Sequence, residues 1–543
     1  MKKYSIGIDY GTLSARALLI DLETGKEIAE SDFVYPHAVM TDADFTGIRL
    51  LKTDAFQNPQ DYLDAFSNTV KSVLKQSEIT PEQVVGVGID FTSCTVLPTK
   101  ADGTPLCFLE PFKNEPQSYV KLWKHHSAES EAEAITEAAQ QLGEAWLESY
   151  GGKVSSEWLF PKLLETLHKS PAVFNECDCF LEAADWLVWQ LTGEEVRSSC
   201  MAGYKALWSK EMGYPSSAFW SKVDAGFGDI IGTKISEKVL PTGTKAGTIN
   251  RRGAEFSGLC VGTPIAVPII DAHSALPAAG IVDSGRLMII AGTSSCHIVM
   301  SREDKEVKGI CGRVQDGIIP GLVAYEAGQA CVGDSFDWFV KNCVPASYTE
   351  EAKIKGQNIF DYITQKAEKL SVGESGILAL DWWNGNRTPY ANYDLTGTII
   401  GLNVRTKPEE IFRAIIESTA FGTKAIIDLY NQNGVTISEI QAAGGISQKN
   451  AFMMQVYADV LGCPVKIAAS TQAGAKGSAI FASVAGGYFD NVFDAALVIA
   501  DKSVKTYYPN EENHKKYQLL YKEYRKTCEF FADNDIMKNI KLQ

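Results

Sequence analysis

The chain opens with two short apolar runs that meet at a turn. Residues 4–9 and 15–21 are largely apolar, and Gly11 and Thr12 lie between them. Apolar runs of this length bounded by turn residues are typical of β-strands, so we expect a hairpin here. Residues 84–90 form another such run, which predicts a buried strand.

The residues between and after these strands favour helices. Asn58 and Pro59 provide a cap and a first helical position, and apolar residues then recur at helical spacing. The middle of the chain predicts three more helices, over roughly 131–149, 157–168 and 180–191. The last of them ends at Thr192-Gly193, as a helix C-terminus commonly does. We interpret this helix-rich stretch as an insertion between segments of sheet.

A second strand-rich region repeats the start of the chain. The apolar run 287–291 leads into a turn that contains the same residue types as the first turn, followed by another apolar run. With both turns aligned 281 positions apart, three pairs match: Gly11 with Gly292, Thr12 with Thr293, and Ser14 with Ser295. A repeat of this kind indicates two similar structural halves.

A later segment extends the repeat. Residues 437–443 form an apolar run that ends in Gly444-Gly445 and precedes a helix at roughly 450–461, much as residues 84–90 lead into their own loop. The pattern predicts an α/β fold with two actin-like (ribonuclease H-like) ATPase domains, a cleft between them and helical insertions. The expected boundaries are 1–275 for the N-terminal domain, 276–508 for the C-terminal domain, and 509–543 for a helix packed on the latter.

Composition narrows the class of partner. The 543 residues include 51 Lys and Arg against 67 Asp and Glu, a net charge of −16, which disfavours nucleic acid and anionic membranes as partners. No apolar run approaches the ~18 residues that a membrane helix requires, so we expect a cytoplasmic protein. The 12 cysteines are dispersed and are interpreted as free thiols. These data do not distinguish a monomer from a homodimer.

The repeated turns carry the first candidate chemistry. Backbone amides and hydroxyls in a turn such as Gly11, Thr12 and Ser14 can bind phosphate oxygens, and Asp9 at the end of the strand can hold Mg²⁺. A single turn of this composition is more often an ordinary hairpin. Its repetition at Gly292-Thr293-Ser294 favours a nucleotide held between two hairpins, and neither a Walker motif nor GxGxxG occurs.

Several segments resemble the FGGY family of carbohydrate kinases over essentially the whole chain. The second family signature is matched at Gly401-Leu402, Glu410-Ile411 and 414–417. Other segments that resemble the family are IGIDYGTLSARALL at the start, YKALW at 204–208, DAH at 271–273, DWWNGNRTP at 381–389 and AAGGIS at 442–447. The first signature is less well met, because residues 157–162 lack its lysine-aromatic-x-tryptophan order, and His125 stands where many relatives carry aspartate.

The resemblance implies roles for particular residues. Asp271 follows an apolar run and precedes a helical stretch, a position that suits either a helix cap or a group facing the cleft; the resemblance implies that it is the catalytic base. The implied sugar contacts are Ser93, Lys205, Asp271 and Glu326. The implied nucleotide contacts, besides the two turns, are Gln329, Gly444, Gly445 and Asn450, with ATP and Mg²⁺ as the nucleotide and metal.

Among FGGY kinases the chain most resembles those that act on L-ribulose, so the implied reaction is ATP-dependent conversion of L-ribulose to L-ribulose 5-phosphate. Three alternatives stay open. Another family member, acting on xylulose, D-ribulose or glycerol, would share the catalytic residues. An actin-like ATPase without a sugar substrate, and a sugar sensor that binds but does not phosphorylate, belong to other functional classes.

Overall fold

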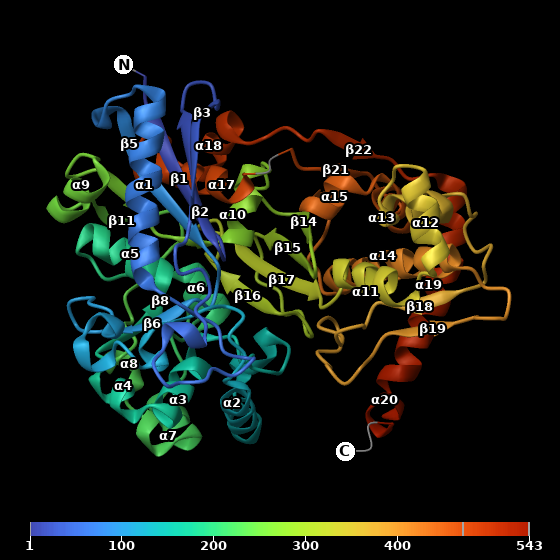
Figure 1. The fold of residues 1–543 in the computed structure, drawn as a ribbon, viewed down its shortest axis with the longest axis horizontal. Helices are drawn as coiled ribbons and strands as arrows, with labels where there is room; N and C mark the ends of the chain where they lie inside the picture. The colour runs from blue at the N-terminus through green and yellow to red at the C-terminus, as the bar shows by residue number, and fades with distance from the viewer. Residues whose placement is uncertain (1, 470–471, 541–543) are drawn as a thin grey trace.

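The computed structural model describes residues 2–469 and 472–540 and contains two large mixed sheets side by side (Figure 1). The first sheet, with β1, β2 and β5, lies on the left of the view, and the second, with β14, β15 and β17, lies at the centre. Helix α10 (Asp271–Ala278) lies between them, and a helical insertion with α2, α3, α4 and α7 lies below the first sheet. This arrangement is the predicted one of two α/β halves with helical insertions.

Strands of the first sheet follow the predicted hairpin. Strand β1 pairs antiparallel with β2 and parallel with β5, because the first connection is a short turn and the second contains a helix. The strands, in sheet order, are β11 (Lys245–Thr248), β12 (Pro264–Ala266), β5 (Val84–Phe91), β1 (Tyr4–Tyr10), β2 (Ser14–Asp21) and β3 (Glu27–Val34), and β13 (Ile269–Ile270) also pairs with β5.

The second sheet repeats this topology. Strand β14 pairs antiparallel with β15 and parallel with β20, just as β1 pairs with β2 and β5. The strands, in sheet order, are β16 (Gly312–Gln315), β17 (Val323–Gln329), β15 (Ser295–Ser301), β14 (Arg286–Ala291), β20 (Glu439–Ala443), β21 (Val465–Ile467) and β22 (Lys505–Tyr507). The internal repeat predicted from the two turns is therefore a repeat of the fold.

The two turns differ in length, which corrects one predicted match. In the first hairpin the last paired residues are Tyr10 and Ala15, whereas in the second they are Ala291 and Ser295. The second turn is thus one residue shorter, and the residue equivalent to Ser14 is Ser294 rather than Ser295. A constant sequence offset could not show this, because it assumes equal turn lengths.

Helices of the first half match the prediction with two exceptions. Residues 131–149 are α2 followed by a separate 3₁₀ segment, since Gly143 adopts a left-handed conformation that ends the helix. Residues 180–182 belong to a strand, and only the rest of the predicted 180–191 helix is helical. The helices are α1 (Pro59–Ser77), α2 (Glu129–Leu142), α3 (Leu159–Lys169), α4 (Pro171–Glu176), α5 (Ala183–Thr192), α6 (Ser199–Lys205), α7 (Ser217–Val223), α8 (Ile230–Thr233) and α9 (Arg251–Ser257).

The remaining elements complete the two halves. The smaller sheets are formed by β4 (Phe56–Gln57), β7 (Val120–Lys121), β6 (Val96–Thr99) and β8 (Cys179–Glu182), by β9 (Arg197–Ser198) and β10 (Val239–Leu240), and by β18 (Leu378–Leu380) and β19 (Thr398–Ile400). The later helices are α11 (Gly333–Cys343), α12 (Ala346–Ile354), α13 (Ile359–Glu368), α14 (Pro408–Gln432), α15 (Gly445–Lys449), α16 (Ala451–Leu461), α17 (Ala473–Ala485), α18 (Val492–Ile499), α19 (Glu511–Ala532) and α20 (Ile536–Asn539).

Helix α17 packs against the first sheet although it comes late in the chain. Its backbone approaches β1 and β5 so closely that a Cβ atom at Gly7 or Gly88 would collide with carbonyl oxygens of Ala475 or Ser478. The Ala- and Gly-rich composition of residues 471–486 predicts a close-packed helix; the structure has this helix over Ala473–Ala485, and residue 471 lies outside the described residues. The predicted boundaries place this helix in the second domain, whereas its packing joins it to the first sheet.

The last long helix packs on the second half, as expected. Tyr517, Tyr521 and Tyr524 lie on one face of α19, are buried, and belong to the same hydrophobic cluster as Phe421 of α14. Among the residues that the structure describes, no helix combines the length and apolar character needed to cross a membrane.

Candidate active site

Asp271 begins α10 directly after β13, at the carboxyl end of the first sheet. Its Oδ1 accepts a hydrogen bond of 2.6 Å from the backbone N–H of Ala272, and its side chain is only half-buried. Burial within the site raises the pKa of Asp271 to about 7, and the neighbouring Asp9 carboxylate adds to the rise. A carboxyl group with a pKa near neutrality is well suited to accept and release a proton under physiological conditions.

This pKa predicts a pH dependence. A base must be deprotonated to act, so kcat/KM should rise with pH, reach half its maximum near pH 7 and level off above about pH 8, with an acidic limb of apparent pKa about 7 rather than about 4. Steady-state kinetics in buffers between about pH 5.5 and 8.5 would measure this limb. A flat profile through that range would contradict the assignment of Asp271 as a base with a raised pKa.

Two further carboxyl groups lie beside Asp271, at the ends of β1 and β5. Asp9 is half-buried and Asp90 is fully buried, and burial raises the pKa of both. Ser478 of α17 donates a hydrogen bond of 2.7 Å to Asp90 Oδ2, while Asp90 Oδ1 has no hydrogen-bond donor among the described residues. Gly474, near the start of α17, leaves room beside both carboxyl groups.

This cluster has the donor set of a divalent cation site. Oxygen ligands from carboxylates are those that Mg²⁺ prefers, and three neighbouring carboxyl groups with so few cations around them repel one another unless a cation or protons compensate. The charge of Arg16 lowers the pKa of Asp9, and the charge of Lys205 lowers the pKa of Asp271. The residues present therefore fit a magnesium ion, with Asp9 as the predicted ligand.

Lys205 and Glu326 meet although they come from different halves of the chain. The Lys205 Nζ lies 3.8 Å from Glu326 Oε1. The Lys205 charge lowers the pKa of Asp271, and the Glu326 charge raises it. Burial alone would raise the pKa of Glu326, but Lys205 and a hydrogen bond from His273 together lower it below its ordinary range. Glu326 is thus a permanent acceptor beside Asp271, and Lys205 is a donor.

His273 is a residue of this site that the sequence did not reveal. Its Nε2 lies 2.8 Å from Glu326 Oε2, and its Nδ1 lies 3.2 Å from the thiol of Cys200. Because burial lowers the pKa of His273, the ring is neutral and Nε2–H donates to Glu326. The DAH segment could have indicated His273, because this histidine lies two residues after the base in the same helix.

A cavity of about 320 Å³ adjoins this group, lined by residues of both halves. Lys205 and Glu326 form part of its wall. The other polar residues that line it are His126, Glu129, Tyr150, Lys153, Ser155, Ser156, Glu157, Arg387 and Tyr393. Of the residues that the structure describes, this lining does not include Ser93, which lies in the loop after β5. The size and polarity of the cavity suit a small polyhydroxy ligand.

The described lining of this cavity does not include His125. It is fully buried, its Nδ1 accepts a hydrogen bond of 3.1 Å from the Ala55 N–H, and its Nε2 lies 2.9 Å from Glu165. Asp54 completes a group of three possible metal ligands, but the Glu165 carboxylate already forms an ion pair with Lys121 at 2.8 Å. His125 is therefore part of a buried polar network.

A larger cavity of about 940 Å³ lies on the second half. Four predicted nucleotide contacts line it, Gly292, Thr293, Gly445 and Asn450. Gly445 has open space around it, and the Asn450 side chain caps α16 by accepting from the Met453 N–H. The lining contributed by α11 and α13 was not predicted, because the helical pattern of those segments does not show which face borders a cavity.

Other predicted nucleotide contacts lie elsewhere. Gln329 is buried in the core, where its Nε2 donates to Asp381 and to the Thr419 carbonyl. Gly444 has a φ of +96° and packs on the Ala291 carbonyl, so its lack of a side chain serves contact between β14 and β20. Gly11, Thr12, Ser14 and Ser294 occupy the two turns, and the described lining of the 940 Å³ cavity does not include them.

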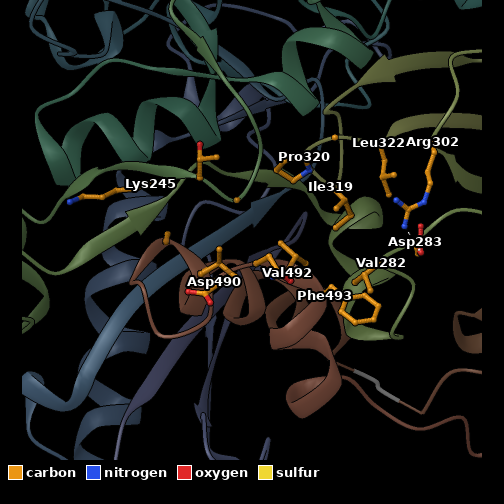
Figure 2. Close-up of a pocket in the computed structure, with 16 residues that line it drawn as sticks. Lys245, Val282, Asp283, Arg302, Ile319, Pro320, Leu322, Asp490, Val492 and Phe493 are labelled. Atoms are coloured by element: carbon orange, nitrogen blue, oxygen red, sulfur yellow. Dashed lines mark hydrogen bonds and ion pairs between the residues drawn. The ribbon is translucent and has the colours of Figure 1, made fainter.

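A third cavity, of about 770 Å³, lies away from all predicted site residues (Figure 2). It is bordered by the β16–β17 connection and by the connection from α17 to α18, with Ile319, Leu322 and Val492 on its walls. Its charged groups are on the surface, and Arg302 is paired with Asp283 at 2.8 Å. This arrangement offers no buried polar group to a ligand.

Comparison with known proteins identifies the family to which the chain belongs. The N-terminal domain of the FGGY family of carbohydrate kinases matches residues 4–277, and its C-terminal domain matches residues 287–486. The chain belongs to the FGGY family. This FGGY kinase is therefore a carbohydrate kinase, a phosphotransferase that uses ATP and a sugar as its substrates.

Individual relatives cover this FGGY kinase from end to end. The ribulokinase of Geobacillus thermodenitrificans is 46% identical over 99% of this chain and 97% of its own length. The ribulokinase of Mycolicibacterium smegmatis is 40% identical over 99% and 96%, respectively.

Solved structures share the fold. Xylulose kinase from Rhodospirillum rubrum superposes with a TM-score of 0.79 at 19% identity and covers 98% of this chain and 100% of its own. Glycerol kinase from Plasmodium falciparum with ADP gives a TM-score of 0.72 at 17% identity, with 97% and 98% covered. The predicted fold class is confirmed.

Proposed function

We propose that this FGGY kinase transfers the γ-phosphoryl group of ATP to L-ribulose and releases L-ribulose 5-phosphate and ADP. The observation that carries the proposal is the 46% identity to ribulokinases over nearly the whole chain. The meeting of Asp271, Lys205 and Glu326 supports it, since a sugar needs a base at one hydroxyl and paired donors and acceptors at its others.

Asp271 is the proposed base. Its carboxylate takes the proton of the terminal sugar hydroxyl as that oxygen attacks the γ-phosphorus and the bond to the ADP oxygen breaks. Lys205 donates to a sugar hydroxyl and Glu326 accepts from one, which holds the sugar in line. His273 donates to the other carboxylate oxygen of Glu326 and keeps it in place. Ser93 is a further proposed sugar contact.

The nucleotide is proposed to lie between the two hairpin turns. The turns at Gly11 to Ser14 and Gly292 to Ser294 would bind phosphate oxygens, and the 940 Å³ cavity beside Gly445 and Asn450 would take the adenosine end. Asp9 would hold Mg²⁺, which when bound neutralises charge on the phosphates. The buried positions of Gln329 and Gly444 favour supporting roles behind this site.

The experiment that tests this function is an ADP-release assay with a panel of acceptors. We expect L-ribulose to give the highest kcat/KM, ahead of D-ribulose, ribitol, D-xylulose and glycerol, and little release without a sugar. Highest activity with D-xylulose or glycerol would replace the proposed substrate with another within the family. ADP release that needs no sugar would indicate an ATPase, and none with any sugar would indicate a sensor.

A further inference from the structure

Arg387 lies in the wall of the 320 Å³ cavity without a role in the reaction described so far. It belongs to the segment DWWNGNRTP and is half-buried. Its guanidinium forms no ion pair with any residue of the described ranges 2–469 and 472–540, although it donates a hydrogen bond to the Tyr393 hydroxyl. A half-buried guanidinium with spare donors favours a ligand that accepts hydrogen bonds from them.

Lys205 and Glu326 connect the surroundings of Asp271 with the cavity that Arg387 lines. The charges of Lys205 and Glu326 shift the pKa of Asp271, the first downward and the second upward. The same two residues line the cavity together with Arg387. Asp271 itself does not belong to the described lining. Glu326 is thus a neighbour of both, since its charge raises the pKa of Asp271 and the Arg387 charge helps to lower the pKa of Glu326.

Part of the cavity wall comes from the first half of the chain. Glu157 borders the cavity, and its charge raises the pKa of both Arg387 and Lys205. Lys153 lies 5.6 Å from the centre of the Tyr393 ring, so the two halves also meet at the cavity edge. A ligand held by Arg387 and Glu157 would contact both halves at once.

We propose that Arg387 anchors the end of the sugar remote from the phosphorylated hydroxyl, which in a 2-ketopentose is the carbonyl end. This inference rests on the proposed function. With the terminal hydroxyl at Asp271 and the middle hydroxyls at Lys205 and Glu326, carbons 1 and 2 extend into the cavity beside Arg387. A guanidinium only donates hydrogen bonds and a carbonyl oxygen only accepts them, so the pair is complementary. Glu157 is positioned to accept from the hydroxyl on carbon 1.

The test compares R387Q and R387K with the wild type, and uses R313Q as a matched control. Arg313 is a half-buried arginine on β16 that does not border this cavity. We expect R387Q to raise the KM for L-ribulose roughly tenfold to a hundredfold, with the KM for ATP changed less than about twofold. R387K keeps the charge without the planar fork and should fall between R387Q and wild type. R313Q should match wild type.

Ribitol separates anchoring of the carbonyl from general support of the cavity. It carries a hydroxyl in place of the carbonyl, so R387Q should raise its KM less and narrow the preference for ribulose. An unchanged KM for ribulose, or equal losses for ribulose and ribitol, would overturn the proposal; R387K decides if R387Q does not fold. If the acceptor panel selects another sugar, the proposed substrate fails, and the same variants assayed with that sugar still judge Arg387 by its KM.

Discussion

Replacing Asp271 by asparagine should lower kcat by about 10²- to 10⁴-fold while leaving the affinity for ATP nearly unchanged. Asparagine has almost the same size and can still accept the hydrogen bond from the Ala272 N–H, so the local structure should persist. It cannot take a proton from the sugar hydroxyl. Rapid-quench or steady-state ADP release would measure the first effect, and calorimetric titration with ATP the second.

Asp283→Asn is the matched control. Asp283 lies beyond the end of α10, beside the 770 Å³ cavity, where it pairs with Arg302 on the surface. A surface ion pair contributes at most about 1 kcal/mol, so this variant should retain the turnover of the wild type. Near-normal turnover of Asp271→Asn would show that another group accepts the proton.

Replacing Lys205 by methionine should raise the KM for the sugar by about two orders of magnitude. The change removes a charged donor, worth about 1.5–3 kcal/mol to a bound hydroxyl, and also leaves Glu326 with His273 as its remaining partner. The pKa of Glu326 should then rise, because the Lys205 charge no longer lowers it. Steady-state kinetics with sugar and ATP varied separately would show the effect on the sugar alone.

Lys210→Met provides the control for this variant. Lys210 follows α6 by a few residues and pairs with Asp316, but its side chain is 56% exposed and does not border the 320 Å³ cavity. Its replacement should leave both KM values within about twofold. A sugar KM that Lys205→Met leaves unchanged would remove Lys205 from the sugar site.

The repeated topology could be predicted from sequence because local patterns encode it. Each half begins with an apolar strand, a Gly-Thr turn and a second apolar strand, and each later supplies a parallel strand through a helical crossover. The position of Asp271 between a strand and a helix was predictable for a similar reason, whereas its role as the base was implied by the family resemblance and stays a prediction.

The features that could not be predicted from the sequence depend on contacts between distant segments. The packing of α17 on the first sheet joins residues almost 400 positions apart, such as Ser478 and Asp90, and no local pattern marks that approach. The same holds for His273 with Glu326 and for Arg387 in the cavity wall. Gln329 was expected at the nucleotide because of its sequence neighbours, yet it lies at the end of a strand whose side chains are buried on both faces.

ATP is proposed to lie with its phosphates between the two hairpin turns and its terminal phosphate toward Asp271. The decisive experiment is a crystal structure of the Asp271→Asn variant with Mg²⁺, ATP and L-ribulose. We expect phosphate oxygens within hydrogen-bond distance of Thr12 and Thr293 and the terminal sugar hydroxyl beside residue 271. A triphosphate bound away from either turn, or a sugar whose hydroxyls do not reach residue 271, would contradict the account.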